Sequence, residues 1–239
     1  MPDSVIHIAE DNPRDREFLQ QALNGLAVEF HREGLSALER LAQLEQIYLL
    51  TDIQMPDLDG LSLAKTLWQT HPSARIVFWS NHADESYLRE LQKIVPEQTV
   101  YGYVLKNNTS DELRAALHAV FDADHCWIDP LIKPIQARLS TRSDALSDVE
   151  YEALVDMALG LTDNAIAKRR YLSRRGVQNR LAAIYHKLNA NDESVTPEWI
   201  NPRVRAVKQA IERGLLNDEI LRQADDALQR WLAQQIRAK

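Results

Sequence analysis

Residues 50–60 read Leu50-Thr51-Asp52-Ile53-Gln54-Met55-Pro56-Asp57-Leu58-Asp59-Gly60. They overlap the end of the short apolar run Ile47–Leu50 and precede Leu61–Gln69, where apolar residues recur at spacings of three and four. The first pattern is typical of a buried strand, and the second is typical of an amphipathic helix. The stretch therefore predicts a turn between a strand and a helix, with Asp52 at the carboxyl end of the strand.

The same alternation recurs across the first half of the chain. Apolar or aromatic runs at Val5–Ala9, Ile76–Trp79 and Val100–Leu105 predict further strands, and helical spacing continues over Arg14–Leu26. Strands that alternate with helices favour a parallel sheet covered by helices on both faces. We therefore predict a doubly wound α/β domain.

Polar side chains follow these strands where the carboxyl edge of the sheet is expected, which is where open α/β sheets place their active sites. They are Glu10 with Asp11, then Asp52, Ser80 and Lys106. Grouped carboxylates repel one another unless a cation lies among them. Mg²⁺ prefers such oxygen ligands, and Lys106 can bind a phosphoryl oxygen as a point charge. An aspartate beside these cations can act as a nucleophile and form an aspartyl phosphate.

Residues 3–122 resemble the receiver domain of two-component response regulators, which has a five-stranded, doubly wound sheet. The resemblance rests on Glu10-Asp11, residues 50–60, Ser80, Tyr103 and Lys106. It implies that Asp52 is the phosphoacceptor, that Ser80 and Tyr103 form the switch pair, and that Lys106 pairs with the phosphate. It also implies an Mg²⁺ site with ligands from Asp11, Asp52 and the Gln54 backbone carbonyl, and with Glu10 bound through water.

The net charge of −7 hides a division of charge along the chain. Residues 1–125 hold 20 acidic and 10 basic residues, whereas residues 126–239 hold 15 acidic and 18 basic residues. Residues 164–188 carry seven basic residues and no acidic residue. Such a run is either a solvated helix face or a phosphate-binding surface.

The pattern around this basic run predicts three helices. Ser147 with Glu150 forms a capping box, Thr162 can cap a second helix, and Ser173 can cap a third helix that runs to Leu188. The third helix has an apolar side and an opposite side that carries basic and amide residues. Basic side chains can neutralise phosphates, and amides can pair with base edges in the major groove. The residues predicted to contact DNA are Arg174, Arg175, Gln178, Asn179, Arg180 and Lys187.

Residues 146–216 resemble the LuxR-type helix-turn-helix domain of NarL/FixJ-class regulators. The resemblance rests on residues 146–154, 160–167, 172–188, 205–207 and 214–216. Residues 123–145, which include Pro130 and Pro134, are predicted to form a linker. Two features fall outside the family pattern: a longer loop over 189–202, and an additional amphipathic helix within 217–239. The apolar side of that helix packs either on its own domain or against a second subunit or the receiver domain.

Together these patterns predict a transcription factor that a sensor histidine kinase activates at Asp52 and that binds double-stranded DNA as a homodimer. Its catalysis is expected to be limited to phosphotransfer and dephosphorylation of its own aspartate. No membrane-spanning or signal-peptide pattern is present, so a cytoplasmic location is expected. One alternative is a signalling module whose helical half binds a protein. Another is an aspartate-nucleophile phosphatase, which is disfavoured because Gln54 supplies no second acid.

Overall fold

The computed structural model describes residues 5–81, 83–140, 145–190 and 200–237. The chain divides into two compact units, of which the first contains Met1–Ala83 and Tyr87–Ile135 and the second contains Asp84–Ser86 and Gln136–Lys239. The predicted linker residues 141–144 and the central residues 191–199 of the extended loop lie outside the described residues. Each unit has its own hydrophobic core and is described separately.

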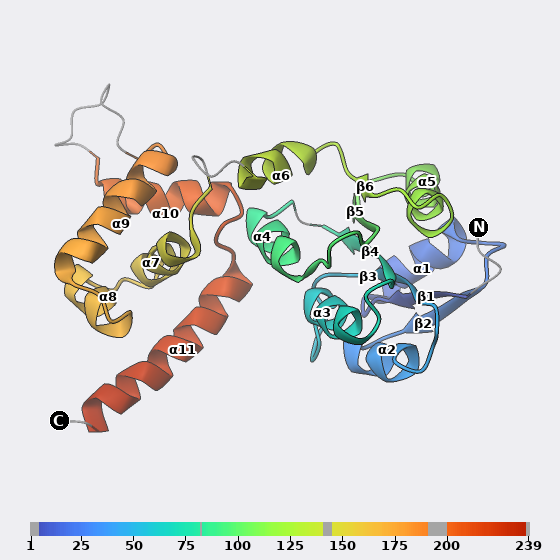
Figure 1. Cartoon of the computed structure of the whole chain (residues 1–239), viewed down its shortest axis with the longest axis horizontal. Helices are drawn as coiled ribbons and strands as arrows, with labels where there is room; N and C mark the ends of the chain where they lie inside the picture. The colour runs from blue at the N-terminus through green and yellow to red at the C-terminus, as the bar shows by residue number, and fades with distance from the viewer. Residues whose placement is uncertain (1–4, 82, 141–144, 191–199, 238–239) are drawn as a thin grey trace. The chain divides into compact units, whose positions relative to one another are not determined.

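The first unit contains a six-stranded parallel sheet with the strand order β2-β1-β3-β4-β5-β6 (Figure 1). The strands are β1 (Ile6–Ala9), β2 (Val28–His31), β3 (Tyr48–Thr51), β4 (Arg75–Ser80), β5 (Tyr101–Leu105) and β6 (Trp127–Ile128). In the register, Ala9 lies opposite Thr51, and Phe78 lies opposite both Thr51 and Tyr103. The carboxyl ends of β1, β3, β4 and β5 therefore meet at one edge.

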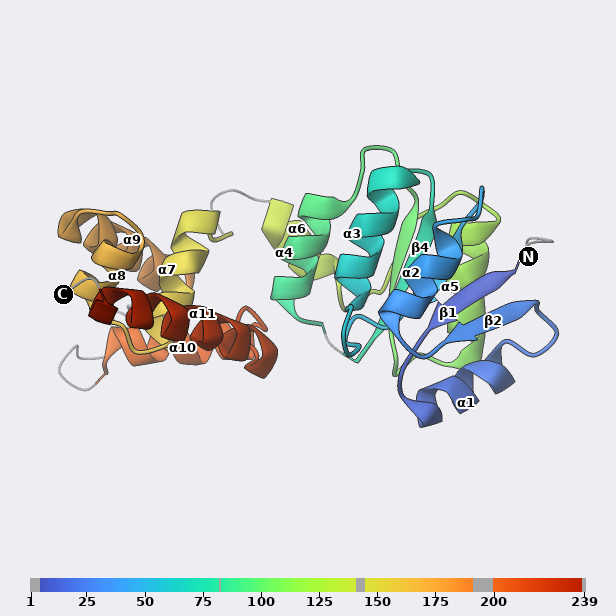
Figure 2. The ribbon, with the colours of Figure 1, turned by 90° about the horizontal axis from the view of Figure 1, so that it is seen from below.

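Helices cover both faces of this sheet, as predicted (Figure 2). They are α1 (Pro13–Ala22), α2 (Gly34–Leu41), α3 (Gly60–Thr70), α4 (Glu85–Ile94) and α5 (Ser110–Phe121). On the face covered by α1 and α5, Leu19 and Leu117 belong to the same buried cluster as Ile8 and Val104. Helices α2 and α3 pack together, and α2 contacts β1 and β2. This arrangement confirms the doubly wound α/β prediction.

The sheet has one strand more than the five expected from the resemblance. The additional strand β6 pairs in parallel with β5, placing Trp127 opposite Gly102. The buried Asp129 follows β6, where its backbone N–H donates to the Tyr103 carbonyl at 2.9 Å and its Oδ2 accepts from the Asn108 amide at 2.6 Å. A two-residue strand is too short to produce a periodic signal. Residues 123–135, predicted as linker, thus lie in the first unit.

The second unit is helical, with α7 (Asp148–Ala158), α8 (Asp163–Arg169), α9 (Arg174–Lys187), α10 (Pro202–Glu212) and α11 (Asp218–Arg237). Helix α6 (Lys133–Ser140) contains the boundary between the units. The predicted caps are present: the side chains of Ser147, Thr162 and Ser173 accept bonds from the third backbone N–H of α7, α8 and α9. Each cap satisfies an amide that has no partner within its own helix.

The apolar side of α11 packs on its own unit. Leu228 is buried in the same core as Leu154 of α7, and Ile220, Leu221, Ala224 and Trp231 pack against that core. Of the two alternatives for this helix, the structure therefore shows packing on its own domain. Leu232, near the end of the helix, is 39% exposed.

Asp156 of α7 is fully buried and is held by two arginines. Its Oδ1 lies 2.8 Å from Arg169 Nη1, and its Oδ2 lies 2.7 Å from Arg170 Nε. Both guanidinium groups lose a buried partner if this carboxylate is removed. Two of the seven basic residues of segment 164–188 therefore have a structural role.

We expect Asp156→Ala to lower the free energy of unfolding of the second unit by about 3–5 kcal/mol, because it removes the fully buried partner of Arg169 and one of the two partners of Arg170. The measurement is urea-dependent hydrogen exchange of the amides in α7, α8 and α9. Glu152→Ala is the matched control, since Glu152 also pairs with Arg170 but its side chain is 52% exposed. That control should cost less than about 1 kcal/mol. Equal effects of the two substitutions would contradict the role assigned to Asp156.

Candidate functional site

The ends of β1, β3 and β5 bring three of the predicted site residues together. Lys106 Nζ lies 2.7 Å from Glu10 Oε2 and 3.0 Å from Asp52 Oδ2. The Asp52 backbone N–H donates to the Ala9 carbonyl at 2.9 Å, which fixes the two acids on adjacent strands. The Lys106 side chain is 5% exposed, so its charge acts within a largely desolvated pocket.

A third acid also pairs with Lys106, and the sequence analysis did not identify it. Asp15 Oδ2 of α1 lies 2.6 Å from Lys106 Nζ. Helix α1 begins two residues after Asp11, with Asn12 as N-cap and Pro13 in the first turn. Asp15 follows the N-cap Asn12 by three residues, so it lies in the first turn of α1, close to the strand end that carries Glu10. That spacing was the available signal.

Backbone contacts hold the loops around Asp52. Arg16 Nη1 donates to the carbonyl oxygens of Glu10 at 2.8 Å and of Asp11 at 2.6 Å. The Gln54 backbone N–H donates to Asp52 Oδ1 at 3.2 Å. At Gly60, a Cβ atom would lie 2.0 Å from the Asp52 carbonyl oxygen, so a side chain there would displace the acidic loop. Glycine is therefore required at the end of the 50–60 stretch.

Burial has a strong effect on the charges of the pocket. Burial raises the pKa of Glu10 to about 7, against the opposing effect of the bond from Lys106. Burial also raises the pKa of Asp52, again opposed by Lys106. Burial alone would lower the pKa of Lys106, but its bonds to Asp15 and Glu10 raise it above the ordinary value. Three carboxyl groups, those of Glu10, Asp15 and Asp52, thus surround the single ammonium group of Lys106.

This donor set fits a hard divalent cation. Ligand oxygens of Glu10, Asp11 and Asp52 lie within 4.8 Å of one another. Carboxylate oxygens with room for water are the ligands that Mg²⁺ prefers. A cation here would also reduce the repulsion among the buried acids. Three of the residues predicted for Mg²⁺, Glu10, Asp11 and Asp52, therefore lie close enough together to share one ion.

The predicted switch residues lie along the same edge. Ser80 is buried at the end of β4, and its carbonyl accepts from the Lys106 backbone N–H at 2.8 Å. Tyr103 is fully buried, with its ring centroid 6.4 Å from that of Phe78. The Tyr103 ring therefore lies inside the domain, next to β4.

Two further side chains define the surroundings of the pocket. Lys106 Nζ lies 4.7 Å from the centroid of the Trp79 ring, a cation–π arrangement that the sequence analysis did not anticipate. The Gln54 side-chain amide donates to the Tyr87 hydroxyl at 2.6 Å. The position two residues after Asp52 therefore carries a hydrogen-bonded amide instead of an acid.

Helix α9 carries the second set of predicted site residues. Its buried side consists of Val177, Leu181 and Ile184. Arg174, Arg175, Gln178 and Asn179 are exposed on the opposite side, followed by Ala182 and His186. The helix therefore presents one exposed surface with positive charges at its start and amides one turn later, and we call these four residues the α9 face.

The other two predicted contact residues make bonds within the unit. Lys187 Nζ lies 2.8 Å from Glu150 Oε2 and donates to the Ala145 carbonyl at 2.9 Å. Arg180 Nη1 donates to the Gly176 carbonyl at 3.1 Å. Tyr171, which the sequence analysis did not single out, is 95% exposed between α8 and α9, with a φ of 54°.

Comparisons with known proteins agree with this architecture. Residues 6–118 match the response regulator receiver domain family. The transcriptional regulatory protein DegU of Brevibacillus brevis is 26% identical over 231 residues, covering 83% of this chain and 95% of DegU. The transcriptional regulatory protein FixJ of Rhizobium meliloti is 28% identical over 200 residues, covering 80% of this chain and 91% of FixJ.

A solved structure of two RcsB dimers bound to two parallel DNAs shares the fold, with a TM-score of 0.59 at 20% identity. The match covers 89% of this chain and 99% of the RcsB chain.

The fold and the matched domain thus define a receiver-type α/β protein with a helical second domain. Residues 6–118 therefore belong to the response regulator receiver domain family. Over the described residues, no helix has the length and apolar character needed to cross a membrane.

Proposed function

We propose that this chain is a response regulator and transcription factor that is phosphorylated on Asp52 by a sensor histidine kinase and binds double-stranded DNA through the α9 face. The observation that carries the proposal is the exposure of Arg174, Arg175, Gln178 and Asn179 along one side of α9. The names of DegU and FixJ, both transcriptional regulatory proteins, support the same function.

Phosphotransfer to Asp52 is supported by the geometry of the pocket. An Asp52 carboxylate oxygen attacks the phosphorus of the donor, forming an O–P bond while the bond to the donor's imidazole nitrogen breaks and that nitrogen keeps the electron pair. Lys106 Nζ lies 3.0 Å from Asp52 Oδ2, close enough to pair with the transferred group. Ser80 supplies a hydroxyl at the neighbouring strand end.

Glu10, Asp11, Asp52 and the Gln54 carbonyl are the proposed Mg²⁺ ligands. When bound, the metal would offset the negative charge that gathers as phosphoryl oxygens approach these acids. Arg16 contributes by holding the carbonyls of Glu10 and Asp11, which keeps the acidic loop in position. Asp15 and Glu10 orient the Lys106 ammonium.

DNA recognition by α9 follows from its two kinds of exposed side chain. Arg174 and Arg175 would contact phosphates, which fixes the position of the helix without reading sequence. Gln178 and Asn179 can form bidentate pairs with adenine in the major groove. A homodimer would present two copies of α9 to half-sites one helical turn apart, about 34–36 Å between centres.

The test is selection of bound DNA from random duplexes by the full chain, with and without a phosphodonor and Mg²⁺. We expect enrichment of paired half-sites, and stronger enrichment after phosphorylation. A chain that is phosphorylated at Asp52 but enriches no sequence would contradict DNA reading. That outcome would favour a protein partner for the second unit.

A further inference from the structure

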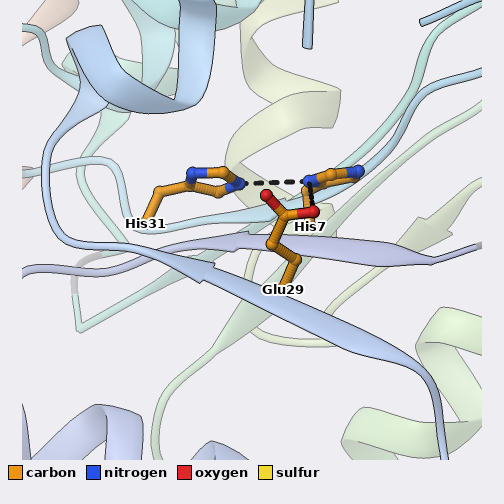
Figure 3. Close-up of side chains that lie close together, drawn as sticks. All are labelled: His7, Glu29 and His31. Atoms are coloured by element: carbon orange, nitrogen blue, oxygen red, sulfur yellow. Dashed lines mark hydrogen bonds and ion pairs between the residues drawn. The ribbon is translucent and has the colours of Figure 1, made fainter. Parts of the chain in front are cut away.

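A second polar cluster lies in the first unit, away from the acidic pocket, and consists of His7, Glu29 and His31 (Figure 3). His7 belongs to β1, and the other two residues belong to β2 at the edge of the sheet. His7 pairs in register with Glu29, and His31 is two residues further along β2. Because side chains alternate along a strand, all three lie on the same face of the sheet. Helix α2 packs against β1 and β2.

The ligand atoms of this cluster converge. His7 Nδ1 lies 3.0 Å from His31 Nε2 and 3.8 Å from Glu29 Oε2, and all three atoms lie within 4.8 Å of one another. Ligands bound at about 2.0–2.1 Å in a tetrahedral zinc site are about 3.3–3.4 Å apart. The two distances from His7 Nδ1 are therefore each within about half an ångström of the spacing in a tetrahedral zinc site.

The charge state of the cluster also suits a metal. His7 and His31 are 2% and 7% exposed, and burial lowers the pKa of both imidazoles, helped by the charge of Arg40 and opposed by Glu29. Neutral imidazole is the form that binds metal. Arg40 Nε on α2 lies 3.2 Å from Glu29 Oε1, so the Oε2 atom is held toward the two rings. Such outer partners orient ligands at metal sites.

We propose that His7, His31 and Glu29 form a site for Zn²⁺ that is separate from the Mg²⁺ pocket. Imidazole nitrogen favours Zn²⁺, whereas an all-oxygen acidic cluster favours Mg²⁺. The Glu29 side chain is 38% exposed, so the cluster is in contact with solvent, which would supply the ion and a water molecule as the fourth ligand. Bound zinc would fasten the edge strand β2 to β1.

The proposed zinc site is also connected to the acidic pocket by a backbone hydrogen bond. The Glu10 backbone N–H donates to the His31 carbonyl at 3.0 Å. Zinc at His31 would therefore fix the strand that supports the first acidic residue of the pocket. This link is not needed for zinc binding itself, so the proposal can be tested without phosphorylation.

The experiment is competition between the full chain and a chromophoric zinc chelator, with excess Mg²⁺ present to occupy the acidic pocket. Wild type should bind one zinc ion. Glu29→Gln keeps the shape of an exposed side chain and should weaken binding about tenfold or more, and His31→Gln should weaken it further. Co²⁺ substitution should give visible absorption bands typical of a tetrahedral nitrogen and oxygen site, and these bands should be lost in His31→Gln.

His118→Gln and Cys126→Ser are the controls, since both residues are exposed and each offers a surface zinc ligand. Neither should change the affinity. Circular dichroism in zinc-free buffer establishes that each variant is folded. The proposal is overturned if wild type binds no zinc, if folded His31→Gln and Glu29→Gln bind it as wild type does, or if a control variant abolishes binding.

Discussion

Replacing Asp52 by Asn should abolish phosphoryl labelling of the full chain by acetyl phosphate in the presence of Mg²⁺. An amide oxygen carries no charge and is a poor nucleophile, and the substitution also removes a proposed ligand of the metal. The chain should stay folded, because Lys106 keeps its ion pairs with Glu10 and Asp15. Intact-mass spectrometry measures the gain of one phosphoryl group.

Asp57→Asn is the matched control for this substitution. Asp57 lies in the same loop, is exposed, and has a φ of 65°, which asparagine tolerates. This variant should be labelled like wild type, and removal of Mg²⁺ by EDTA should prevent labelling of both. Labelling that survives in Asp52→Asn would place the acceptor elsewhere. Loss of labelling in Asp57→Asn alone would do the same.

The features that could be predicted from the sequence depend on short-range physics. Helix caps use hydrogen bonds within four residues, so Ser147, Thr162 and Ser173 could be recognised by spacing. Buried parallel strands are continuous apolar runs, which located β1, β3, β4 and β5. Strand β2 was not located: Val28-Glu29-Phe30-His31 at the sheet edge lacks a continuous apolar run, and its alternation of apolar and polar residues extends over only four residues.

The features that could not be predicted depend on contacts between distant residues. The pairing of Lys106 with Asp15 joins positions 91 residues apart, and that of Lys187 with Glu150 joins positions 37 apart. In the sequence, Lys187 is one more base in a basic segment. Its ion pair exists because α7 and α9 pack together. Counting bases therefore gave the sign of the charged surface correctly but included side chains that act inside the domain.

Three basic residues of segment 164–188, Arg169, Arg170 and Lys187, form ion pairs within the second unit. The surface available to DNA is therefore smaller than the seven basic residues suggest. We expect the double substitution Arg174→Ala with Arg175→Ala to weaken DNA binding about tenfold or more per arginine at low salt, as charge-assisted bonds to phosphate are lost. The plot of log affinity against log salt should become less steep by about 1.8, because two phosphate contacts no longer release counterions. Fluorescence anisotropy with a selected duplex measures both quantities.

Gln178→Ala distinguishes reading of bases from attraction to phosphates. It should cost about 1–3 kcal/mol and relax the sequence preference at one position, while leaving the salt slope unchanged. Arg230→Ala on α11 is the charge-matched control, since Arg230 is also an exposed arginine in the second unit but lies outside the α9 face. It should leave affinity and slope near wild type. If Arg230→Ala weakens binding as much as loss of one α9 arginine, or if the double variant keeps the wild-type slope, α9 is not the surface that meets DNA.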